Sequence, residues 1–230
     1  MSFITSGADS MPTLFCIGEV SEIQPTRESK KGTYLVTEFK ITPLGAANKE
    51  ARGYLTWHPD YMKPGYAPSM EKDKGRKMVY DSNIARDSKG FNPVSTQYKG
   101  QAVGLANLQG LCGSAEKFKE VGEELQAAYA AAETPDDLVA AFDVIVGKLV
   151  GTTVGYCLKQ QWVPVEGSDN GNGYPVRVPG KYYELAGMFY PTKESLEAIE
   201  EGVEKAKSYA EKKGNPTPQV YICFDASVPF

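Results

Sequence analysis

The sequence is poor in the residues that build metal centres. It contains one histidine, His58, and four cysteines at positions 16, 112, 157 and 223. Zinc sites use cysteines and histidines in closely spaced pairs, whereas these residues lie far apart along the chain. The pattern therefore predicts buried thiols, no metal ion and no cofactor. His58 stands between Trp57 and Pro59 without a second histidine nearby, and we assign it no catalytic role.

Long apolar runs are missing as well. No stretch approaches the roughly 20 apolar residues of a membrane-spanning helix. Residues 1–6 lack the basic and apolar regions of a secretory signal. We therefore expect a soluble, cytoplasmic protein with no membrane partner.

An overall excess of positive charge is also absent, since 25 basic residues face 29 acidic ones and the net charge is -4. The charge is uneven along the chain. Residues 1–100 contain 14 Lys and Arg against 11 acids, and residues 101–230 contain 11 against 18. A basic side can therefore coexist with an acidic one.

Two strand-like runs, 149–158 and 182–190, dominate the second half of the sequence. In the first run Val154, Tyr156 and Leu158 share a bulky face, whereas Gly151 and Gly155 lie on a nearly bare one. Glycines at alternate positions indicate a tightly coiling sheet or the close approach of another group. The intervening residues 162–181 contain four glycines and three prolines, which predicts an irregular exposed loop.

The remaining pattern supplies three earlier strands and three helices. Strands are predicted near residues 14–23, 34–42 and 51–58. Helices are predicted to begin after the capping residues Ser114, Thr134 and Thr192, and the last of them to end at Gly214. Residues 220–224 read as a further strand. Residues 59–100 lack periodicity and interleave aromatic with basic residues, including the basic segment 72–77.

Three strands, a helical pair and a closing hairpin follow one another in the order of the OB-fold. We predict a mainly β, five-stranded OB-fold barrel with a helical insertion between strands three and four and a C-terminal helix, α+β overall. A single domain is expected over 12–213, with the insertion at about 114–147 and the helix at about 192–213. Residues 214–230 are expected to form a C-terminal tail or strand.

Such a barrel binds oligonucleotides through its strand face and loops, where aromatic rings stack on bases and cations contact phosphates. The predicted nucleic-acid-binding residues are Arg27, Lys30, Lys31, Tyr34, Arg52, Tyr54, Trp57, Tyr156, Lys159, Trp162, Arg177, Lys181 and Tyr182.

The last six residues resemble the acidic tip of phage and bacterial single-stranded DNA-binding proteins, because an aliphatic residue, a proline and a terminal phenylalanine follow an aspartate. The resemblance implies that Asp225, Val228, Pro229 and Phe230 bind replication or recombination proteins. It also implies a bacteriophage protein that coats single-stranded DNA in the host cytoplasm. The tip departs from that family in having a single acid, Asp225.

Two other classes remain open. Glu38 and Lys40 have the acid-x-lysine spacing of magnesium-dependent nucleases, with Glu19 or Glu22 as a second acid if the strand register permits. The acidic net charge and the alanine-rich helix after Ser114 would also suit a structural or assembly protein. We predict a non-enzymatic binder of single strands, and the narrow apolar seam of the last helix leaves a homo-oligomer open.

Overall fold

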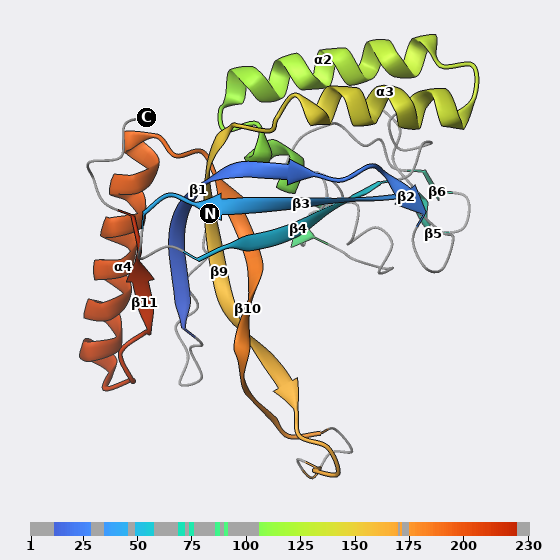
Figure 1. Ribbon diagram of the computed structural model, residues 1–230. Coiled ribbons are helices and arrows are strands. Elements are labelled where there is room, and N and C mark those ends of the chain that lie inside the picture. Colours follow the sequence, from blue (N-terminus) through green and yellow to red (C-terminus); the bar gives the residue numbers. More distant parts are fainter. Residues whose placement is uncertain are drawn as a thin grey trace.

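The chain folds around one mostly antiparallel sheet of seven strands. The computed structural model describes residues 12–28, 35–45, 49–57, 106–169, 171 and 175–224, together with four short strands between residues 69 and 91 (Figure 1). The sheet contains β1 (Thr13–Ile23), β2 (Arg27–Glu28), β3 (Leu35–Pro43), β4 (Ala51–Trp57), β9 (Thr153–Pro164), β10 (Arg177–Phe189) and β11 (Val220–Ile222). The short strands β5 (Ser69–Glu71) with β6 (Lys74–Gly75), and β7 (Arg86–Asp87) with β8 (Gly90–Phe91), form two separate pairs.

The helices begin where their capping residues predict. Ser114 caps α2 (Ala115–Ala131), Thr134 caps α3 (Pro135–Gly147) in a full capping box, and Thr192 caps α4 (Lys193–Lys213). Gly214 ends α4 in the left-handed conformation, at φ +65°. Residues 106–111 add a short helical segment before α2. The mixed α+β class expected from the sequence is therefore confirmed.

Strand β1 holds the sheet together because its two halves have different neighbours. Residues 13–19 pair antiparallel with β9, and residues 18–23 pair antiparallel with β3. The change of partner falls at Gly18, where a Cβ would lie 2.6 Å from both the Ile41 side chain and the Thr42 carbonyl oxygen. A register shift between Val20 and Glu22 accompanies the change in direction of β1 that is visible in Figure 1.

The β9–β10 hairpin is longer than predicted and starts later. Residues 149–152 form a turn, so β9 begins at Thr153, and the paired strands continue through Pro164 and Arg177. The expectation that residues 162–181 lack regular structure is therefore wrong at both ends of that range, where residues 162–164 and 177–181 belong to the two strands. Pro179 is accommodated because it lies at a register shift, where a missing backbone donor is tolerated. The hairpin projects away from α2 and α3 (Figure 1).

Two apolar clusters lie on opposite faces of β1. Leu14, Cys16 and Val20 belong to the larger one, which includes residues of β3, β4, β9, α2 and α3. Phe15 and Ile17 point the other way and pack with Leu196 and Val203 of α4. Alternate residues of β1 are therefore covered by helices on both faces of the sheet, with α2 and α3 on one face and α4 on the other.

Strands β4 and β10 approach each other without a hydrogen-bonded ladder among the described residues. A Cβ on Gly53 would lie 2.7 Å from the Leu185 side chain, so the strands touch there. Farther along, the 106–111 helical segment separates them. Asn107 donates a hydrogen bond of 3.0 Å to the Tyr54 carbonyl oxygen, and a Cβ on Gly110 would collide with the Met188 side chain. The helical segment therefore occupies the edge of β4 with which β10 would have to pair to close the sheet into a barrel.

Candidate functional site

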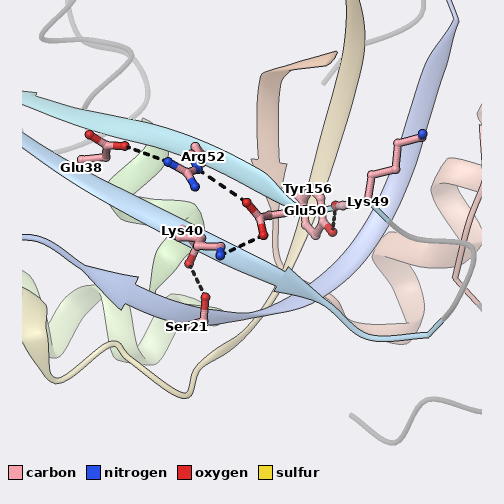
Figure 2. A network of polar contacts seen from close by, with 7 residues as sticks. All are labelled: Ser21, Glu38, Lys40, Lys49, Glu50, Arg52 and Tyr156. Carbon is pink, nitrogen blue, oxygen red and sulfur yellow. Dashed lines mark hydrogen bonds and ion pairs between the residues drawn. The ribbon is translucent and has the colours of Figure 1, made fainter. Parts of the chain in front are cut away.

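Polar side chains lie on the side of β3 and β4 that faces away from the core. Figure 2 shows the contacts among four of them, Glu38, Lys40, Glu50 and Arg52. Thr37, Phe39 and Ile41 of β3 are buried, so the intervening Glu38 and Lys40 point outward. In β4 the buried positions are Ala51, Gly53, Leu55 and Trp57, which leaves Arg52 and Tyr54 outside. We call the group Arg27, Glu38, Lys40, Glu50, Arg52 and Tyr54 the polar face.

Lys40 and Arg52 lie directly opposite each other in the β3–β4 ladder. Like charges in such positions repel, and Glu50 offsets the repulsion by contacting both. The Lys40 Nζ lies 2.9 Å from one Glu50 oxygen, and the Arg52 Nε lies 3.5 Å from the other. The hydrogen bond from Lys40, with a smaller contribution from Arg52, lowers the pKa of the Glu50 carboxyl, which therefore stays charged at neutral pH.

Glu38 lies between two arginines. Its carboxylate oxygens are 3.8 Å from Arg27 Nη2 and 3.9 Å from Arg52 Nη1, and both arginine side chains are more than half exposed. These separations exceed hydrogen-bonding distance, so the ion pairs are loose. Loosely held, exposed guanidinium groups can turn toward an external anion without breaking a strong contact.

Tyr54 provides an aromatic ring on the same surface. Its side chain is 47% exposed, and its backbone is fixed on both edges of β4, by pairing with Glu38 and by the hydrogen bond from Asn107. An exposed ring on a fixed backbone next to cations suits stacking with a planar ligand.

The β9–β10 hairpin carries further residues of the predicted site. Tyr182 is 62% exposed, and the Lys181 Nζ lies 5.0 Å from its ring centroid. Lys159 is half-buried. Trp162 and Arg177 pair with Pro179 and Pro164, while their side chains lie outside the described part of the structure.

Two of the predicted stacking rings lie in the core instead. Trp57 is 4% exposed and its ring centroid lies 4.3 Å from that of Phe142 on α3. Tyr156 is fully buried and donates a hydrogen bond of 2.5 Å to the Lys49 carbonyl oxygen (Figure 2). Burial raises the pKa of the Tyr156 hydroxyl. Neither ring can stack on a base in this conformation, and this corrects their assignment to the interface.

Several predicted residues fall outside the described residues. They are His58, Lys30, Lys31 and Tyr34, the tip residues Asp225, Val228, Pro229 and Phe230, and the side chains of the basic segment 72–77.

Sequence reasoning missed Lys49 and Glu50. The Lys49 Nζ lies 5.1 Å from the ring centroid of Tyr183, and Glu50 joins Lys40 to Arg52. Only the strand register, which places Lys40 opposite Arg52, reveals the need for an acid between them.

The surroundings of Glu38 do not resemble a magnesium site. Glu22 pairs with Lys40 and Glu19 with Thr42, so neither acid is opposite Glu38. Within the part of the chain that the structure describes, no three His, Cys, Asp or Glu side chains are grouped to hold a metal ion. The nearest charged partners of Glu38 are Arg27 and Arg52.

Comparison with known proteins identifies no relative of this chain. No family model, curated protein or solved structure matches the chain. Among the described residues, none of the helices combines the length and the apolar character needed to span a membrane.

Proposed function

We propose that the protein binds single-stranded DNA on the polar face, largely without sequence preference, and coats unpaired DNA during replication or recombination. The observation that carries the proposal is the placement of Lys40 and Arg52 side by side across β3 and β4, with the exposed Tyr54 on the same surface. The cations would contact phosphates, and the tyrosine ring would stack on a base.

The strand path supports an OB-fold barrel as the scaffold. β1 joins β3 to β9, β4 and β10 touch at Gly53 and Leu185, and α2 and α3 lie in sequence between β4 and β9. In this proposal the gap between β4 and β10 is filled by side chains and by the 106–111 segment, in place of a hydrogen-bonded ladder. OB-folds bind oligonucleotides on the face of their second and third strands, which correspond here to β3 and β4.

The expected energetics are modest for each contact. Stacking on one aromatic ring contributes about 1–3 kcal/mol, and each phosphate neutralised on a single strand changes the salt slope by about -0.7. Arg27, Lys40 and Arg52 together therefore predict a slope of about -2 for the logarithm of the association constant against the logarithm of salt concentration.

Fluorescence anisotropy of labelled oligo-dT, duplex DNA and oligo-rU, each titrated with protein at several salt concentrations, tests the proposal. We expect the single strands to bind more tightly than the duplex, with the salt slope given above. Absence of binding at low salt, or preference for the duplex, would contradict it. Magnesium added to the same samples tests the nuclease alternative, which requires cleavage.

Replacing Glu38 with glutamine should tighten binding to oligo-dT. The carboxylate competes with phosphate for Arg27 and Arg52, and one unit charge at about 4 Å in water is worth about 1 kcal/mol, or roughly fivefold in affinity. The control is Glu204→Gln, which makes the same charge change on α4, where Glu204 pairs with Lys207 at 2.8 Å. Equal effects of the two substitutions would show that only net charge matters.

Recruitment of replication or recombination proteins through Asp225, Val228, Pro229 and Phe230 remains part of the proposal. Its support is the resemblance of these residues to the tips of single-stranded DNA-binding proteins.

A further inference from the structure

The short strand β11 brings two cysteines from opposite ends of the chain together. β11 pairs parallel with β1 through Thr13 with Val220, Leu14 with Tyr221 and Phe15 with Ile222. The Cys223 amide then donates a hydrogen bond of 2.8 Å to the Phe15 carbonyl oxygen, which extends the pairing by one step. In this register Cys223 lies beside Cys16. Neighbouring strands are about 4.8 Å apart, within the range of roughly 4.4–6.8 Å that Cα atoms span in disulfides.

The two side chains face the same side of the sheet. Cys16 belongs to the larger apolar cluster and is fully buried, whereas Cys223 packs against that cluster and remains partly exposed. Neither thiol is part of a disulfide. Reagents in solution can therefore reach Cys223 first, while Cys16 lies directly behind it.

The surroundings of the two thiols shift their pKa values in opposite directions. A hydrogen bond between them, together with burial, raises the pKa of Cys16. The same hydrogen bond, with a smaller contribution from the Lys49 cation, lowers the pKa of Cys223 to about 7. Cys157 and Cys112 behave differently, because burial raises their pKa values to about 11 and about 12. Cys223 is thus the thiol with substantial thiolate at neutral pH, and the thiolate is the reactive form.

We propose that Cys16 and Cys223 are a reversible redox pair, whose disulfide fastens β11 to β1. The oxidant is a low-molecular-weight disulfide such as glutathione disulfide. The Cys223 thiolate attacks one of its sulfurs, which forms a mixed disulfide and releases one glutathione thiolate. Cys16, after losing its proton, attacks the Cys223 sulfur and releases the second glutathione. The protein loses two electrons and two protons, and one glutathione disulfide becomes two glutathione molecules.

The disulfide would fasten a short element. β11 contributes three residues to the edge of β1, and Cys223 lies at its end. A bond from residue 16 to residue 223 encloses nearly the whole chain, and cross-links of long loops stabilise most. Oxidation would therefore add a covalent link to this strand, whereas reduction would leave it held by its backbone pairing and apolar contacts alone. Formation of this disulfide does not require binding of single strands.

Intact-mass spectrometry of the full-length protein after treatment with glutathione disulfide tests the pair. We expect the loss of two hydrogen masses, a non-reduced peptide that links Cys16 to Cys223, and a midpoint of thermal unfolding raised by roughly 10 °C. Dithiothreitol should reverse all three changes. In Cys16→Ala we expect one glutathione to remain attached to Cys223, whereas Cys157→Ala should still form the disulfide between Cys16 and Cys223.

Three results would overturn the proposal. One is a stable glutathione adduct on Cys223 of the unaltered protein without loss of the second glutathione. Another is a cross-link that involves Cys112 or Cys157. The third is the absence of any reaction under conditions that oxidise a model dithiol peptide. The measurements on the unaltered protein decide the matter even if Cys16→Ala does not fold.

Discussion

Replacing Trp57 with alanine is expected to lower the free energy of unfolding by about 3–5 kcal/mol, because large aromatic side chains in cores cost this much when truncated. The ring stacks against Phe142 and connects β4 to α3 within the larger apolar cluster. Its loss would leave a cavity beneath that helix. Urea denaturation followed by circular dichroism measures the change.

The matched control is Trp57→Phe, which keeps an aromatic ring against Phe142. The indole Nε1 is buried and has no hydrogen-bond partner among the described residues, so phenylalanine removes no described hydrogen bond. We expect a smaller cost than for alanine, because less of the buried ring is removed and the cavity is smaller. If Trp57→Ala costs no more than the control, the ring does not support the core. If folded Trp57→Phe loses affinity for oligo-dT while its stability is unchanged, the ring belongs to the interface after all.

Replacing Tyr54 with alanine is expected to weaken binding to oligo-dT by roughly 5- to 150-fold, which corresponds to the loss of about 1–3 kcal/mol of base stacking. Stability should change little, since the side chain is exposed and the Tyr54 carbonyl oxygen still accepts the hydrogen bond from Asn107. Tyr54→Phe should retain most of the affinity because it keeps the ring. Anisotropy titrations at constant salt give the comparison.

Tyr209 on α4 provides a closely matched control for Tyr54. It is 50% exposed, and the Lys213 Nζ lies 6.0 Å from its ring centroid, so it is also an exposed tyrosine beside a cation. Tyr209→Ala should leave the affinity unchanged. Equal losses at Tyr54 and Tyr209 would show that exposed tyrosines act without regard to position, which contradicts a defined site on β3 and β4.

Local signals predicted the helices well because helix ends depend on nearby residues. Ser114, Thr134 and Thr192 each accept a hydrogen bond from the backbone amide three residues later, and Gly214 ends the last helix. The order of the main strands could also be predicted, because the alternation of apolar and polar residues along a strand is a local signal. The extent of the β9–β10 hairpin could not be predicted, since the glycines and prolines of residues 162–181 indicated a loop, whereas Pro179 lies within β10 at a register shift.

The polar face shows which features can be predicted from the alternation of buried and exposed residues along a strand and which cannot. Tyr54 and Trp57 are three residues apart, so one strand must place them on opposite faces, and the burial of Leu55 and Trp57 leaves Tyr54 outside. Tyr156 likewise shares a face with Val154 and Leu158, two apolar residues that are buried with it. Both errors could have been avoided from the sequence. The contacts of Glu50 with Lys40 and Arg52 could not, because they depend on the pairing of two strands.

Photocrosslinking of iodouracil-substituted oligo-dT, followed by peptide mapping, tests the central claim most directly. If single-stranded DNA lies on the outer surface of β3 and β4, the main cross-link should be at Tyr54, with less at Tyr182, and excess unlabelled oligo-dT should abolish it. Cross-links confined to α4, or no specific cross-link at low salt, would contradict the account.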